Sequence, residues 1–554
     1  MKRLAAPTLA LLLLCGACDT PSTEAPQAAP RTGYPALDLP VQPNVLWLVA
    51  EDMSPYLSSF GDSTVETPHL DRLANEGVRY TNVFSVSGVC APSRFSLATG
   101  VYTTSAGAHN MRTGSRPDYM EAIGLVPYET APAPEVRMMS EVLRRHAYYT
   151  SNNAKHDYQF TAPVTAWDES SPQAHWRNRP AGMPFFSVFN FGVTHESRIW
   201  SKAQDSLWVD ENLDVPIPPY LPATEAVRRD VRRLYSNVRE MDHQVGKILA
   251  ELEADGLLDS TIVVFYTDHG GPLPRQKRLL YDSGLHVPMI IRFPMAQYAG
   301  VVDDQLVSFV DFAPTTFSLV GIEGPSYHEG RAFLGPARAA EPRRYIHAAA
   351  DRLDTEYDMI RAVRDHSFKY LRNFQPERGY YLAVTYREQM ASMQELLRLR
   401  DEGGLDEYQA QWFRPGKPDE ELFDTDSDPD ELRNLATDPA YSDKLAELRT
   451  ELDRWMEATN DKGFIPEGDL LEQFWPGRRQ PVTAAPDAQK DGDRITLLSP
   501  TEGASIGYQI LAEGEEPGDR WRVYTTPVTL PAGQRLRVVA HRLGYAPSAV
   551  VEVR

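Results

Sequence analysis

Apolar and polar positions follow each other along the chain in blocks that predict buried strands separated by amphipathic helices. Uninterrupted apolar runs are typical of strands buried on both faces of a parallel sheet. Such runs occupy residues 44–50, 184–191 and 261–267. Apolar residues at helical spacing predict helices over 67–77, 138–145 and 226–255. The alternation favours an α/β fold with a large, mostly parallel sheet flanked by helices.

The pattern changes after about residue 342. Shorter strands and a helix predicted over 440–459 indicate a smaller α+β subdomain at 343–480, beside a main domain at 43–342. A polar segment at 481–493 is predicted to be a linker. Residues 494–554 alternate between apolar and polar positions, with turns between, and predict a small all-β sandwich module.

The first residues carry the pattern of an export signal. A basic start and an apolar run ending at Leu14 are too short for a membrane span and predict a signal peptide. Small residues before Cys18 resemble a lipidation site, although Cys15 is unusual there; the alternative is cleavage without a lipid. We expect a lipoprotein signal peptide at 1–18, a flexible tether at 19–42, and a bacterial periplasmic or cell-surface protein held to the membrane by its lipid alone.

Charge and cysteine content narrow the function classes. The chain has 554 residues and a formal net charge of −21, which argues against a nucleic-acid partner. It has 3 cysteines. If Cys15 leaves with the signal and Cys18 is lipidated, Cys90 is the remaining thiol and no internal disulfide can form. A single retained thiol in an exported chain is explained more easily by chemistry than by packing.

Acidic residues and a histidine follow two of the predicted strands. Glu51 and Asp52 come directly after the run 44–50, and Asp268 and His269 come directly after 261–267. Each residue alone would be an ordinary polar side chain, but open α/β sheets bind ligands at the carboxyl ends of their strands. Together the four predict a divalent cation site, and the oxygen-rich set favours Ca²⁺ or Mg²⁺ over zinc.

The segment Cys90-Ala91-Pro92-Ser93-Arg94 reads as a loop entering a helix. Cys90 then lies near the positive end of that helix, where Arg94 adds a guanidinium and an anion is favoured. The same surroundings would acidify a thiol, so a cysteine nucleophile is one reading. A buried structural cysteine is the other.

These five residues match the C-x-P-S-R signature of the type I sulfatases, which belong to the alkaline phosphatase-like superfamily. Residues 67–77 resemble the family's T-P-N-L-D-R-L-A-x-E-G segment. The resemblance implies that a formylglycine-generating enzyme oxidises Cys90 to formylglycine, and that a hydroxyl of the hydrated aldehyde attacks sulfur. It also implies a metal site formed by Glu51, Asp52, Asp268, His269 and Cys90.

Glu51 departs from the family's usual aspartate. The longer side chain suits the looser coordination of Ca²⁺ better than the strict octahedron of Mg²⁺, so we expect calcium.

The resemblance implies further catalytic residues. Arg94, Lys155 and Lys277 are the expected cationic contacts, and His195 is expected to protonate the leaving group. The family's histidine stands two positions after the lysine, where this chain has Asp157, whereas His156 follows Lys155 directly; either residue could take that role. Weaker candidates for binding substrate are His109, Arg112, Arg275, Arg278 and His286.

Residues 424–455 and 272–274 look most like bacterial sulfatases of the N-sulfoglucosamine sulfohydrolase type. The resemblance implies a sulfuric ester hydrolase that removes sulfate esters or N-sulfate from a glycosaminoglycan or another sulfated polysaccharide. One alternative is a phosphonate or phosphodiester hydrolase of the same superfamily. Another is a glycan-binding lipoprotein without catalytic activity.

Overall fold

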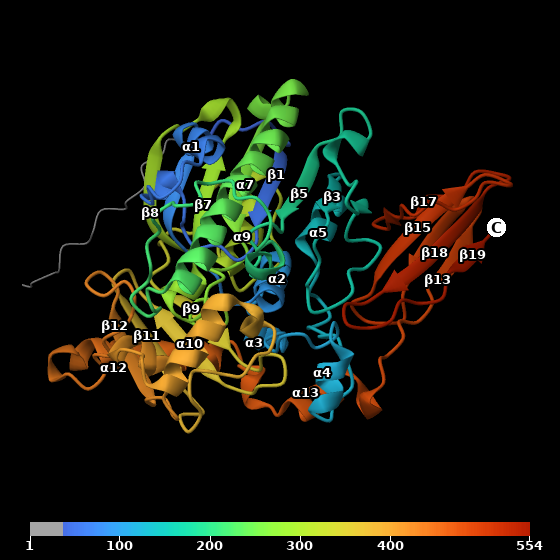
Figure 1. The fold of residues 1–554 in the computed structure, drawn as a ribbon. Helices are drawn as coiled ribbons and strands as arrows, with labels where there is room; N and C mark the ends of the chain where they lie inside the picture. Colours follow the sequence, from blue (N-terminus) through green and yellow to red (C-terminus); the bar gives the residue numbers. More distant parts are fainter. Residues whose placement is uncertain (1–36) are drawn as a thin grey trace, which may run out of the picture. The chain divides into compact units, whose positions relative to one another are not determined.

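The structure is a computed structural model, which describes residues 37–554 (Figure 1). The predicted signal peptide, with Cys15 and Cys18, and most of the predicted tether lie outside the described residues. Within 37–554, no helix combines the length and the apolar character that crossing a membrane requires.

The core of the protein is an eight-stranded sheet in the order β4-β3-β5-β1-β6-β7-β2-β8. Its central strand β1 (Asn44–Ala50) pairs in parallel with β5 (Phe185–Phe191) and β6 (Thr261–Thr267). The strand β7 (His286–Arg292) runs antiparallel to its neighbours β6 and β2 (Val78–Phe84). The other strands are β3 (Tyr149–Asn153), β4 (Glu169–Ser170) and β8 (Val301–Ser308). The predicted mostly parallel sheet is confirmed.

Helices cover both faces of this sheet, because the side chains of β1 alternate between two apolar clusters. Leu46 and Leu48 pack with α1 (Pro68–Asn75) and α7 (Glu225–Ala254). Val45 and Trp47 pack in the other cluster, which includes residues of α2 (Cys90–Thr99), α5 (Met139–Arg145) and α9 (Phe312–Leu319). The helices predicted from periodicity begin and end within two residues of α1, α5 and α7.

A second sheet follows in the chain, antiparallel and four-stranded, in the order β12-β11-β10-β9. Its strands are β9 (Ile346–Ala350), β10 (Ile360–Arg364), β11 (Phe368–Asn373) and β12 (Glu420–Asp424). The longer helices of this region are α10 (Ala391–Glu402) and α12 (Ser442–Ala458). Shorter helices along the chain are α3 (Thr103–Ala106), α4 (Pro117–Ala122), α6 (Ser197–Ser201), α8 (Asp282–Leu285), α11 (Glu407–Ala410) and α13 (Glu467–Phe474).

The last residues form two small antiparallel sheets around their own apolar cluster. One contains β13 (Asp487–Asp491), β14 (Arg494–Leu498) and β17 (Val528–Thr529). The other contains β16 (Arg522–Val523), β15 (Ser505–Leu511), β18 (Arg535–His541) and β19 (Val551–Val553). The strand β13 lies in the segment predicted to be a linker. It pairs with β14 because Gly492, at φ 62°, allows the tight turn between them.

Candidate active site

Four buried side chains converge where β1 and β6 end. Asp52 and Asp268, which follow these strands, are both fully buried. The backbone N–H of Asp52 donates to Asp268 Oδ1 over 3.0 Å, and Asp52 Oδ1 lies 3.0 Å from His269 Nε2. The ligand atoms of Asp52, Asp268, His269 and Cys90 all lie within 4.8 Å of one another. Two adjacent buried carboxylates need a nearby positive charge, so this donor set fits a cation.

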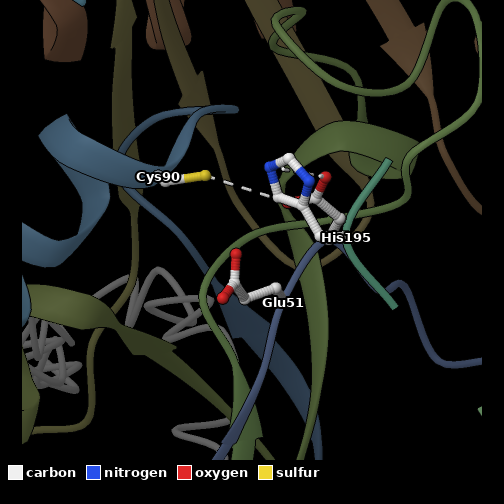
Figure 2. A group of neighbouring side chains, drawn as sticks. Glu51, Cys90 and His195 are labelled. Atoms are coloured by element: carbon white, nitrogen blue, oxygen red, sulfur yellow. Dashed lines mark hydrogen bonds and ion pairs between the residues drawn. The ribbon is translucent and has the colours of Figure 1, made fainter. Parts of the chain in front are cut away.

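The fifth predicted ligand, Glu51, lies on the other side of Asp52. Its carboxylate groups with Asp52, Cys90 and His195 rather than with Asp268 and His269. Figure 2 shows the side chains of Glu51, Cys90 and His195 converging, with Cys90 Sγ directed at the His195 ring. Asp52 and Cys90 therefore belong to both groups, and a metal ion held by all five residues would lie beside these two.

The helix α2 begins at Cys90 and is buried along its whole length. Cys90 Sγ lies 3.8 Å from Asp52 Oδ1 and 3.5 Å from His269 Nε2. Arg94, one turn later, donates from Nε to Asp268 Oδ2 over 3.0 Å and from Nη1 to Asn190 Oδ1 over 2.8 Å. Arg94 thus fixes one predicted metal ligand, and the helix places its positive end at the sulfur.

Opposing charges shift the pKa values of these groups. Burial raises the pKa of the Cys90 thiol, but Lys277 and a hydrogen bond with His195 act against burial, and the pKa of the thiol lies below its ordinary value. Burial also opposes protonation of His269, yet Asp268 and Asp52 raise its pKa to about 10. For His195, burial and Lys277 lower the pKa, while Asp52 and Cys90 raise it above its ordinary value. The site therefore favours a cation among its carboxylates and a proton on His195.

Lys277 and His195 lie side by side over Asp52. Lys277 Nζ donates to Asp52 Oδ2 over 2.5 Å and lies 3.4 Å from His195 Nε2. The ring of His195 is held from its other side by Ser197 Oγ, 2.9 Å from Nδ1. His195 Nε2 is thus directed toward the cluster, where a proton can be held or delivered.

The segment after β3 separates the two candidates His156 and Asp157. Lys155 Nζ lies 3.2 Å from Glu51 Oε2 and 3.1 Å from Asp157 Oδ2. Lys155 and Asp157 both line the cavity beside Cys90 that is described below. His156 is exposed, stacks on Tyr158, and places Nε2 2.7 Å from Ser170 Oγ. It is not among the residues that line the cavity. The left-handed backbone of Asp157, at φ 57°, directs the chain so that Asp157 lies at the cavity instead.

A cavity of about 470 Å³ opens in front of Cys90. Its lining comes from segments on both sides of the second sheet's first strand, β9, in the sequence. The residues at the reacting end are Cys90, Lys155, Asp157, His195, Lys277 and Arg278. The lining also includes Arg112, Thr113, Glu129, Phe160, Asp354 and Tyr386. The volume suits a sugar-sized ligand.

Of the weaker substrate candidates, Arg112 and Arg278 line this cavity. His109 is buried outside it, and His286 stacks on Phe84 and places Nε2 2.7 Å from the backbone oxygen of Thr81. The guanidinium of Arg275 donates to the backbone oxygens of residues 430 and 431. These three candidates take structural positions because their polar atoms are engaged or enclosed away from Cys90.

Several residues of the site were not predicted from the sequence. Glu196 is fully buried and forms a bidentate ion pair with Arg278, and its backbone N–H donates to Asp52 Oδ2 over 2.7 Å. Its position directly after His195 was an available signal. Asp354, between β9 and β10, and Tyr386 also line the cavity, and nothing in their local sequence marks them.

The comparisons with known proteins agree with this geometry. A family model described as Sulfatase matches residues 43–322. The chain belongs to the sulfatase family. A second model, described as N-sulphoglucosamine sulphohydrolase, C-terminal, matches residues 275–395 of this sulfatase.

Individual relatives support the same assignment. The sulfatase is 52% identical to an ulvan-active sulfatase of Formosa agariphila, over 93% of this chain and 92% of the relative. It is 28% identical to the human N-sulphoglucosamine sulphohydrolase, over 84% of this chain and 96% of that protein. A solved structure, of a protein in complex with its substrate D-glucosamine-2-N,6-O-disulfate, shares the fold with a TM-score of 0.55 at 18% identity, covering 77% of this chain and all (100%) of that one.

The protein is therefore a sulfuric ester hydrolase. Membership of the family implies a formylglycine residue and a divalent metal ion. The buried cluster around Asp52 and Cys90 fits both, because it combines a helix-end sulfur with carboxylate and imidazole ligands in one group.

Proposed function

We propose that this sulfatase removes sulfate from a sulfated polysaccharide, with Cys90 as the precursor of its nucleophile. The observation that carries the proposal is the position of Cys90: at the first turn of α2, 3.8 Å from Asp52 Oδ1, beside a sugar-sized cavity. The 52% identical relative is described as ulvan-active, so ulvan is the first substrate to test.

The proposed roles follow from the contacts. Lys155 and Lys277 neutralise the sulfuryl oxygens, and Arg94 holds Asp268 in place. His195 carries a proton on Nε2 and delivers it to the leaving oxygen. Once formed from Cys90, formylglycine supplies an oxygen nucleophile that can release sulfate again, which a thiol cannot do. A divalent cation would be held by Asp52, Asp268, His269, Glu51 and residue 90, and would polarise a sulfuryl oxygen.

We further propose that the cation is Ca²⁺, that a formylglycine-generating enzyme modifies Cys90, and that the chain is exported and lipidated at Cys18. Support for calcium is the glutamate at position 51, whose longer side chain suits a larger coordination shell. Support for export is the apolar run before Cys18.

The test compares two preparations of the protein, one produced with a formylglycine-generating enzyme and one produced without it. The peptide containing Cys90 is expected about 18 Da lighter after conversion, and sulfate release from ulvan is expected to follow the converted fraction. The Cys90→Ala variant is the matched control. A chelator should abolish release, and Ca²⁺ should restore it better than Mg²⁺. Sulfate release by unconverted Cys90, or faster turnover of a phosphonate ester, would contradict the proposal.

A further inference from the structure

Arg112 lines the same cavity as Cys90 and the predicted proton donor His195. Its guanidinium Cζ lies 4.8 Å from the centre of the Tyr386 ring. The same ring lies 6.4 Å from the ring of His195, centre to centre. The Tyr386 ring therefore lies between Arg112 and the predicted proton donor His195. At this separation, Arg112 can contact another substituent of the sulfated sugar or a group on the neighbouring sugar.

The guanidinium is held in place on one edge and free on the other. Arg112 Nη1 donates to Asp354 Oδ1 over 2.6 Å, and Asp354 is itself 9% exposed. Within residues 37–554, Arg112 Nε and Nη2 make no hydrogen bond. Those two N–H groups form the edge that binds carboxylates and sulfates in parallel pairs. Arg112 retains 15% side-chain exposure at the cavity wall, so this edge is open to a ligand.

The backbone around the pair is strained and rigidly clamped. Both residues of the pair adopt left-handed backbone angles, Arg112 at φ 60° and Asp354 at φ 54°. Such angles cost roughly 1–3 kcal/mol each in a non-glycine residue and cluster at functional sites. The two loops are joined by the N–H of Met111, which donates to the backbone oxygen of Arg352 over 3.0 Å.

The side chain of Arg352 strengthens this connection between the two loops. It is fully buried, donates from Nη1 back to the Met111 backbone oxygen over 3.0 Å, and is fixed by Glu467. Arg112 is therefore preorganised before any substrate binds, which lowers the entropy cost of recognition.

The other cations at the cavity are already engaged. Arg278 is bound at both terminal nitrogens by Glu196. Lys155 faces Glu51 and Asp157, and Lys277 faces Asp52. For a second negative charge on the substrate, the N–H groups that remain unpaired among the described cations of the cavity are therefore Nε–H and Nη2–H of Arg112.

We infer that Arg112, oriented by Asp354 and Tyr386, forms an anion subsite that binds a second negatively charged group of the glycan, a carboxylate or a sulfate, in addition to the sulfate that is removed. The inference rests on the proposed function, because it assumes a sulfated glycan in this cavity. Asp354 and Tyr386 are positioning residues, since they act on the substrate through Arg112.

The test compares the converted enzyme on three sulfated disaccharides: one with a carboxylate on the neighbouring sugar, its carboxyl-reduced counterpart, and a counterpart with a second sulfate in place of the carboxylate. The readout is the ratio of kcat/KM between charged and uncharged substrates. We expect the native enzyme to prefer a charged disaccharide about 10- to 100-fold, the range of one charge-assisted hydrogen-bonded pair. Comparing the two charged substrates identifies which anion is recognised.

The Arg112→Gln variant should reduce this ratio to about 1, mainly through KM. Arg112→Lys keeps the charge without the fork and should give an intermediate ratio. Arg116→Gln, in the same segment but paired with Asp118 away from the cavity, is the control and should keep the native ratio. If Arg112→Gln lowers kcat/KM equally for all three substrates, or if the native ratio is already 1, the subsite is wrong. Failure of the proposed function looks different: the native enzyme would then release sulfate from none of the three.

Discussion

At the scale of single residues, the site is governed by charges that are buried together. Asp52 is the centre of the arrangement, because His269, Lys277 and the backbone of Glu196 all bind its carboxylate. Removing one of these partners weakens the compensation of a buried charge, so each contact affects both stability and the shape of the site.

Lys277 offers the clearest test at this scale. Lys277→Met removes the ammonium nearest to Asp52 and His195, and we expect kcat for sulfate release to fall about 10²- to 10³-fold, as for other lost transition-state contacts. Lys247→Met, on the exposed face of α7, is the matched control. The conversion of Cys90 is measured in each sample, so that a failure of maturation is separated from a loss of catalysis. An unchanged kcat in converted Lys277→Met would contradict the proposed role.

His328 gives a prediction about stability. Its ring stacks on Phe317, neither ring nitrogen has a partner among the described residues, and burial lowers its pKa from 6.5 to about 4. Below pH 6.5 the unfolded chain binds a proton that the folded chain refuses until about pH 4. Stability is therefore lost as the pH falls through this window, by about 2 kcal/mol between pH 7 and pH 5.

The variant His328→Phe keeps the stacking and removes the titration. Urea unfolding at pH 7 and pH 5 should show the native chain losing about 2 kcal/mol more than the variant. Equal losses in the two proteins would show that His328 is protonated in the folded state.

At the scale of elements, close backbone approaches fix the loop that carries Lys277 and Arg278. A Cβ on Gly284, in α8, would lie 2.4 Å from the backbone oxygen of Gln276 and 2.5 Å from that of Leu279. The loop thus fits against α8 only because position 284 has no side chain.

Gly284→Ala should push this loop outward. We expect a loss of about 1–3 kcal/mol in the free energy of unfolding, together with a fall of at least about tenfold in kcat/KM. Gly518→Ala is the control, since its Cβ would meet nothing within 4 Å. Thermal unfolding and sulfate release are measured on both variants. A Gly284→Ala enzyme with native kcat/KM would show that the loop position does not matter for catalysis.

At the scale of the whole described chain, Asp168 links the terminal β-module to the main sheet. Its carboxylate accepts two hydrogen bonds from Arg144, at 2.9 and 3.0 Å, and one from Arg520 Nε at 2.8 Å. Arg144 has 4% side-chain exposure, whereas Arg520 has 43%. The buried half of this network is therefore the part on which stability depends.

Asp168→Ala leaves Arg144 buried without a counter-charge and should cost about 3–5 kcal/mol. Arg520→Ala removes only an exposed partner and should cost at most about 1 kcal/mol. The measurement is urea unfolding of both variants, with limited proteolysis to detect release of the module. Equal effects of the two substitutions would place the stabilising contact elsewhere.

The sequence by itself determined much of the frame. Strands β1, β5 and β6 were predictable because strands buried on both faces consist of continuous apolar residues. Strands β2 and β7 were not predicted, because polar residues such as Arg79 and Asn82 interrupt β2 and Pro288 interrupts the apolar run of β7. The convergence of Asp52 and Asp268 was predictable because the carboxyl ends of neighbouring parallel strands meet at one edge of a sheet. Cys90 was singled out by its C-x-P-S-R signature.

Only the tertiary structure decided which loop residues reach the cavity. Between His156 and Asp157 the direction depends on a left-handed backbone angle, which no side-chain pattern records. Arg275 and His286 instead pack against aromatic residues distant in sequence, Tyr220 and Phe84 respectively. Arg112, Asp354 and Tyr386 meet although 242 residues separate the first two, since contacts between loops distant in sequence exist only once the chain has folded.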